Sequence, residues 1–129
     1  MNKLRLILGD QLNINHSWFK ENNSKITYVM MEVKEETSYV LHHAQKIIAT
    51  FAAMRFFAEQ LQQKGFEVIY FKINDKQNKQ SFYQNINKTI KEKNIGELQY
   101  LEPDEYRLST ELKKLESIEN IKVESVDTE

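Results

Sequence analysis

The feature that most constrains the fold is a long helical stripe between two nearly continuous apolar runs. The runs are ITYVMMEV (26–33) and FEVIYFKI (66–73), which are typical of strands covered on both faces. Between them, apolar residues recur at alternating spacings of four and three, so they share one face of a helix. The stripe consists of Val40, Ala44, Ile47, Phe51, Met54, Ala58 and Leu61. A strand, a helix and a strand in this order predict a βαβ unit with a parallel sheet.

Three further runs complete a predicted set of five strands: residues 3–8, 97–101 and 121–126. Right-handed crossovers between them give an α/β fold with a five-stranded, doubly wound parallel sheet, Rossmann-like, in the order 3-2-1-4-5. We expect residues 1–129 to form one domain, because a chain of this length normally does.

The remaining segments carry weaker helix and loop signals. Thr37 or Ser38 can cap the start of the long helix, and Gly65 is placed to end it. Two shorter stripes predict helices, and HSWF (16–19) predicts a helical turn with an aromatic plug. The shorter stripes are Phe82, Ile86 and Ile90, with Ser81 near their start, and Leu108, Leu112 and Leu115. NDKQNKQ (74–80) is interpreted as a polar loop.

Composition excludes several classes of site. The chain has no cysteine and a formal net charge of −1, so it offers no thiolate metal site, no cysteine nucleophile and no evident phosphate-binding surface. Three glycines are too few for a dinucleotide fingerprint or a Walker loop. No apolar stretch approaches a membrane span, and we expect a cytoplasmic protein.

Polar residues follow the strands that should meet at the carboxyl edge of the sheet. Gly9, Asp10 and Gln11 follow the first strand, and EPDEYR (102–107) follows the fourth. Ligands bind at this edge where the strand order reverses. The pattern by itself favours a simple strand-end turn at Asp10. Arg107 could form an ion pair with Glu102 or Glu105, or contact a partner region. A metal site from His42 or His43 with Glu32, Glu36 or Asp10 is a third interpretation.

Four blocks in order, LILGDQL, EETSYVLHHAQKI, AAMRFFAEQL and EPDEYRL, resemble the N-terminal part of the deoxyribodipyrimidine photolyase-related proteins. This branch of the photolyase and cryptochrome superfamily includes prokaryotic (6-4) photolyases. The resemblance implies an N-terminal antenna-type domain that binds a ribityl-lumazine. It also implies a C-terminal helical domain, absent from this sequence, that holds FAD and a 4Fe-4S cluster and binds damaged DNA.

Carried over by position, the resemblance implies a set of antenna-binding residues. They are Gly9, Asp10, Gln11, Glu36, Tyr39 and Ile47. Carboxylates and amides at these positions suit the N–H groups and hydroxyls of a lumazine. An antenna transfers excitation energy, so this domain needs no catalytic residue of its own.

Two other functions remain open from the residues. The same architecture suits a stand-alone nucleotide-binding or adaptor module. A hydrolase or metal enzyme would use Asp10, Glu36 and His43. The choice between lesion repair and signalling in a parent protein depends on residues outside this sequence.

Overall fold

The computed structural model describes residues 2–20, 23–33, 44–103, 106–118 and 121–126. Five parallel strands form one sheet in the order β3-β2-β1-β4-β5, which confirms the predicted α/β fold and strand order. The strands are β1 (Asn2–Leu6), β2 (Ile26–Met31), β3 (Glu67–Phe71), β4 (Ile95–Leu101) and β5 (Lys122–Val126).

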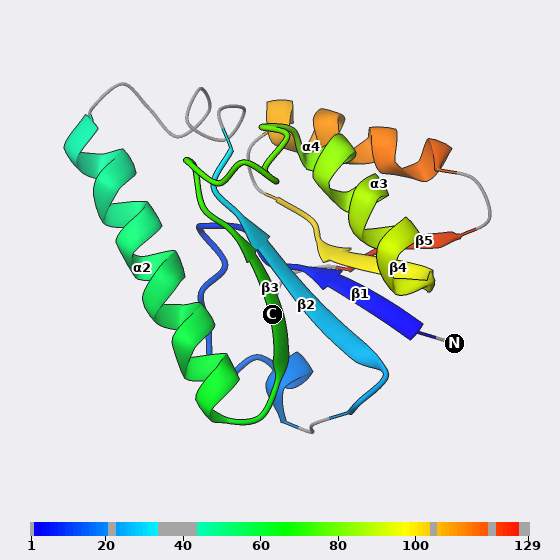
Figure 1. Cartoon of the computed structure of the whole chain (residues 1–129), viewed down its shortest axis with the longest axis horizontal. Coiled ribbons are helices and arrows are strands. Elements are labelled where there is room, and N and C mark those ends of the chain that lie inside the picture. The colour runs from blue at the N-terminus through cyan, green and yellow to red at the C-terminus, as the bar shows by residue number, and fades with distance from the viewer. Residues whose placement is uncertain (1, 21–22, 34–43, 104–105, 119–120, 127–129) are drawn as a thin grey trace.

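Helices cover both faces of the sheet, with α2 on one side and α3 and α4 on the other (Figure 1). The helices are α2 (Ala44–Gln63), α3 (Phe82–Lys93) and α4 (Tyr106–Lys113), with short 3-10 turns η1 (Ser17–Phe19) and η2 (Lys114–Ser117). The predicted cap residues Thr37 and Ser38 lie outside the described residues. None of the helices in the described part of the chain is long and apolar enough to cross a membrane.

The predicted ends of the helices agree with their sequence signals. Gly65 has a φ of 94° just after α2, a left-handed conformation that glycine adopts without steric cost. The Ser81 side chain accepts a hydrogen bond from the Gln84 amide at the start of α3. His16 caps η1 in the same way, through the amide of Trp18.

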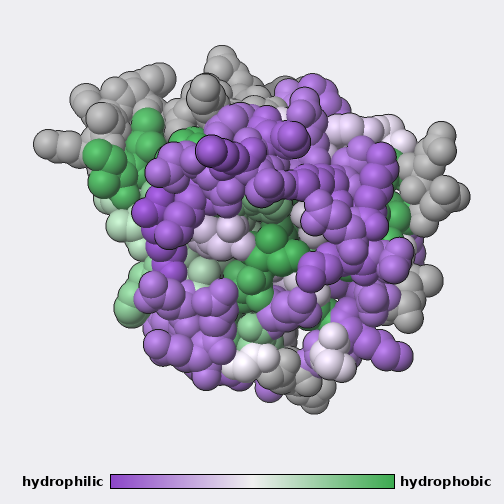
Figure 2. Space-filling model, in the orientation of Figure 1, coloured by the Kyte–Doolittle hydropathy of each residue, from purple (hydrophilic) through white to green (hydrophobic). Residues whose placement is uncertain are grey.

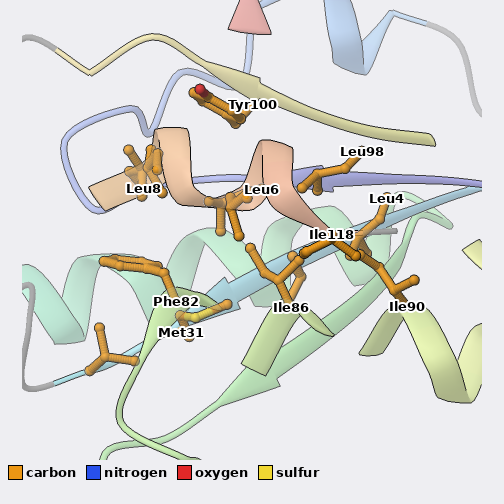
Figure 3. Packing of buried hydrophobic residues seen from close by; sticks show 14 of the residues in the cluster. Leu4, Leu6, Leu8, Met31, Phe82, Ile86, Ile90, Leu98, Tyr100 and Ile118 are labelled. Carbon is orange, nitrogen blue, oxygen red and sulfur yellow. The ribbon is translucent and has the colours of Figure 1, made fainter. Parts of the chain in front are cut away.

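Alternation along β1 divides the core into two layers. Leu4, Leu6 and Leu8 are fully buried in the layer beneath α3 and α4 (Figure 3), whereas Ile7 belongs to the layer beneath α2. Successive side chains of an extended segment point to opposite faces, so β1 and the two residues that follow it together contribute to both layers. This double burial identifies β1 as the centre of the sheet and leaves its carboxyl end as the natural place for a site.

Candidate functional site

The candidate site lies beyond the carboxyl ends of the neighbouring strands β1 and β4. Here Gln11 links the two strands with its side-chain amide. Its Oε1 accepts from the Leu8 amide at 3.2 Å, and its Nε2 donates to the Leu101 carbonyl at 3.1 Å. A further bond of 3.0 Å from the Gln11 amide to the Leu8 carbonyl closes the turn. Gln11 therefore fixes the geometry of the strand-order switch.

The structure describes some of the other predicted antenna residues and not the rest. Gly9 is half-buried and Asp10 is exposed in the turn that Gln11 closes. Ile47 is half-buried on α2. Glu36 and Tyr39 lie outside the described residues, as do His42 and His43. The structure thus brings Gly9, Asp10 and Gln11 together in one turn, and the binding roles of all six residues remain predictions.

Replacing Gln11 by Ala should lower the free energy of unfolding by about 1–2 kcal/mol, because the Leu8 amide and the Leu101 carbonyl both lose their side-chain partner. Chemical denaturation followed by circular dichroism measures the change. Gln84→Ala is the matched control, since Gln84 is exposed on α3 and its replacement should change stability by less than about 0.5 kcal/mol. Equal stabilities of the two variants would contradict the linking role of Gln11.

An ion pair with a buried carboxylate, which sequence reasoning did not predict, lies one strand away from the switch. Glu32 follows β2 and is fully buried. Arg55 of α2 binds its carboxylate with both Nε and Nη2, at 2.7 and 2.8 Å. The Tyr70 hydroxyl and the Ile73 amide donate to the same carboxylate. Glu32 therefore ties α2 to the carboxyl ends of β2 and β3.

These contacts determine the electrostatics of Glu32. Burial alone would raise the pKa of its carboxyl group, but the hydrogen bonds from Arg55, Tyr70 and Ile73 outweigh burial and hold that pKa below its ordinary value. Burial and the neighbouring carboxylate both raise the pKa of Tyr70. Glu32 is therefore charged and Tyr70 neutral at physiological pH.

The metal interpretation receives no support from Glu32. Its two carboxylate oxygens already accept four hydrogen bonds, two of them from Arg55. Among the described residues, no group of three or more His, Cys, Asp or Glu side chains could hold a metal ion. Glu32 is thus a structural carboxylate, and the histidines proposed to join it lie outside the described residues.

The segment after β4 shows a local contact as well. Glu102 accepts a hydrogen bond from the Ser109 hydroxyl of α4, and its amide donates to the Val126 carbonyl at 2.7 Å. The side chain of Arg107 is not among those described, so its predicted partners stay untested. Glu102 thus fastens the end of β4 to both α4 and β5.

Arg5, which interrupts the first apolar run, packs beneath the aromatic plug. Its guanidinium lies 4.8 Å from the centre of the Trp18 ring. It donates to the Tyr28 hydroxyl at 3.0 Å and to Gln99 Oε1 at 2.8 Å. The predicted plug from HSWF is confirmed, because Trp18 is buried against the α2 side of the sheet. Arg5 is therefore a structural cation on this face.

Comparison with known proteins places the chain in one protein family. Residues 5–129 match the model of the family described as deoxyribodipyrimidine photo-lyase-related protein. The chain belongs to this family. It is also 39% identical over 113 residues to a (6-4) photolyase of Agrobacterium fabrum (strain C58 / ATCC 33970). That alignment covers 87% of this chain and 22% of the Agrobacterium protein, so the chain spans about a fifth of this relative.

Proposed function

We propose that this chain is the light-harvesting, chromophore-binding N-terminal domain of a photolyase-related flavoprotein in light-driven DNA repair. The observation that carries the proposal is the turn of Gly9, Asp10 and Gln11 at the switch between β1 and β4, where open parallel sheets bind ligands. Family membership supports the antenna role, because the resemblance implies a lumazine at this position.

The chemistry of the described residues in the turn supports a ribityl-lumazine as the ligand. Gly9 has no side chain, so a flat ring can approach the backbone of the turn closely. The exposed carboxylate of Asp10 can accept from a ring N–H or a ribityl hydroxyl. Gln11 contributes through the shape of the turn, since its amide already bonds both strands. When bound, the lumazine absorbs near-ultraviolet to violet light and passes the excitation to a flavin.

The flavin, the cluster and the DNA belong to a further part of the proposed protein. We place FAD and a 4Fe-4S cluster in a C-terminal helical domain that also binds damaged DNA. The length of the Agrobacterium relative leaves room for such a domain. The present sequence has no cysteine, so the cluster ligands must come from elsewhere. The domain described here has an antenna role and needs no acid, base or nucleophile.

Lumazine binding tests the proposal directly. We expect the chain to bind 6,7-dimethyl-8-ribityllumazine and to quench its fluorescence on titration. Asp10→Ala should weaken binding by about tenfold, the loss of roughly one good charge-assisted hydrogen bond, and Glu36→Ala should weaken it similarly. Glu92→Ala is the matched control, because Glu92 is an exposed carboxylate on α3. Its affinity should equal that of the wild type.

Other outcomes would point to the rival functions. Failure of the wild-type chain to bind lumazine would contradict the antenna proposal. Binding of an adenine nucleotide in its place would favour a nucleotide-binding module. Hydrolysis that disappears with EDTA would favour a metal enzyme, in which Asp10, Glu36 and His43 are the candidates. Equal lumazine affinity in the Asp10 and Glu36 variants would remove both residues from the site.

A further inference from the structure

The solvent-facing side of α2 changes character along the helix. In the second half of α2 its residues are polar, among them Glu59, Gln62 and Gln63. Between residues 47 and 56 the exposed residues are Ile48, Ala49, Ala52, Ala53, Arg55 and Phe56. Arg55 is the only charged residue among these six. The first half of α2 thus carries an apolar stripe on its solvent-facing side.

The stripe differs from the other exposed surfaces of the described residues. Ile48 is 66% exposed and Phe56 is 63% exposed, and these two are the exposed large apolar residues in the described part of the chain. On α3, by contrast, every exposed residue is polar or charged. In Figure 2, apolar atoms gather over the upper end of α2, on the left of the view. A surface helix normally has a polar outer face, so the outer face of α2 is suited to contact with another surface.

A shallow groove lies beside the stripe. It has a volume of about 510 Å³ and runs between α2 and Ile73, with Phe51 in its lining. Ile48, Ala52 and Phe56 also line it, and their spacing of four residues places them in one row along the helix. Because alanine has a short side chain, this row has a hollow at Ala52 between two large residues. We call the row and the groove together the α2 outer surface.

The α2 outer surface lies at the same edge of the sheet as the candidate site. The chain passes from β2 into α2 and returns along the sheet, so the first half of α2 lies near the carboxyl ends of the strands (Figure 1). Ile73, which follows β3, lines the groove from that edge. Ile47, one of the predicted antenna residues, precedes Ile48 in the sequence. A region that docks on this surface is therefore held at the edge where Gly9, Asp10 and Gln11 form their turn.

The size of the stripe limits the kind of partner that it can hold. From Ile48 to Phe56 the stripe is roughly 12 Å long. A stable complex of two separate proteins normally buries about 800 Å² on each partner, and a single short stripe is small for that purpose. A region of the same polypeptide is held nearby at a high effective concentration, so a smaller contact is sufficient. The α2 outer surface is therefore better suited to a region of the same polypeptide than to a separate protein.

We propose that the α2 outer surface docks the helical domain that carries FAD in the full-length protein. This inference rests on the proposed function, in which the chain is one domain of a longer flavoprotein. The Agrobacterium relative supports a further region, because the alignment covers only 22% of that protein. An apolar helix of the second domain packs along α2, with a side chain in the hollow at Ala52, and buries Ile48 and Phe56. Because excitation transfer falls steeply with distance, docking at this edge keeps the flavin at a fixed distance from the lumazine.

Thiol labelling of the full-length protein tests the proposal. The 129-residue chain has no cysteine, so Ala52→Cys introduces a single thiol into this domain and leaves Ile48 and Phe56 intact. Mass spectrometry of the labelled peptide follows the reaction of this thiol with iodoacetamide. We expect the reaction to be at least about tenfold slower in the full-length protein than in the 129-residue chain, because the second domain covers the thiol. Adding Phe56→Glu places a charge in the apolar contact and should restore fast labelling.

The control is Glu92→Cys, at an exposed position of α3 on the other face of the sheet. Its thiol should react equally fast in both proteins. Equal rates for Ala52→Cys in the two proteins would overturn the proposal, as would slow labelling that survives Phe56→Glu. Slow, concentration-dependent labelling of Ala52→Cys in the 129-residue chain would show a second copy as the occupant and overturn it as well. Labelling does not require lumazine, so a failure of docking and a failure of chromophore binding are separate results.

Discussion

Replacing Arg55 by Met should lower the free energy of unfolding by about 2–3 kcal/mol at neutral pH. Glu32 is fully buried, so loss of its guanidinium partner leaves a charge in the interior with only two of its four donors. Removal of one partner from a fully buried pair costs about 3–5 kcal/mol. The lower figure applies here because the Arg55 side chain is 43% exposed and solvent screens the interaction.

The effect of Arg55→Met should depend on pH in a definite direction. In the wild type the pKa of Glu32 lies below its ordinary value of 4.5, so the charged carboxylate stabilises the fold above that value. This stability is lost as the pH falls through the lower folded pKa. Without Arg55, burial dominates and the folded pKa should rise above the unfolded one. The destabilisation of the variant should therefore begin to shrink as the pH falls through the raised folded pKa of the variant, and should shrink further below 4.5, where the wild type itself loses stability.

Urea denaturation at neutral pH and near pH 4 measures both effects. Lys93→Met is the matched control, since Lys93 of α3 forms an ion pair with Glu67 at 3.8 Å and both side chains are about half exposed. Its stability should differ from that of the wild type by less than about 0.5 kcal/mol at either pH. A difference between Arg55→Met and the wild type that stays constant with pH would show that lost packing, and not the charge of Glu32, causes the destabilisation.

The sheet could be predicted from the sequence because its signals are local. Apolar runs give the strands, and the spacing of Phe51, Met54 and Leu61 gives the buried face of α2. The predicted ends of the strands were less accurate. The run 3–8 forms a strand only to Leu6, because the Leu8 amide turns away to the side chain of Gln11. The bond from Leu8 to Gln11 joins residues that are close in the chain. The same Gln11 side chain also donates to the carbonyl of Leu101, which is far along the chain.

The candidate site was only partly predictable. The order of strands placed Gly9, Asp10 and Gln11 at the switch, and the structure agrees with that placement. The interpretation of these residues as an antenna site came from the resemblance of four sequence blocks to a known family. The spacing of the residues alone did not indicate such a site. Glu32 could not be understood from its neighbours in sequence, because its partners Arg55 and Tyr70 come from a helix and a strand far along the chain.

The polar loop 74–80 is a clearer case of contacts that the local sequence does not predict. Its sequence predicts only a solvent-exposed connection, yet Asn78 is buried and bonds in four directions. Its Nδ2 donates to the Glu32 carbonyl at 2.7 Å and to the Lys72 carbonyl at 3.0 Å. Its Oδ1 accepts from the Gln80 amide at 2.8 Å and from Asn85 at 2.9 Å. One asparagine thus joins the ends of β2 and β3 to α3.

Asn78→Ala should therefore lower the free energy of unfolding by about 3 kcal/mol, because several buried backbone and side-chain groups lose their partners together. Asn74→Ala, in the same loop but exposed, is the matched control and should change stability by less than about 0.5 kcal/mol. Thermal and urea denaturation give both values. Similar losses in the two variants would mean that the loop as a whole, and not the bonds of Asn78, supports the fold.

Asn78→Asp separates hydrogen bonding from side-chain volume. The carboxylate has nearly the size of the amide, but it accepts where Asn78 donates to the carbonyls of Glu32 and Lys72. At neutral pH this variant should be at least as unstable as Asn78→Ala. On acidification the protonated carboxyl regains one donor, so its stability relative to the wild type should recover as the pH falls. Urea denaturation across the acidic range would reveal the recovery, and a relative stability independent of pH would show that the donated bonds contribute little.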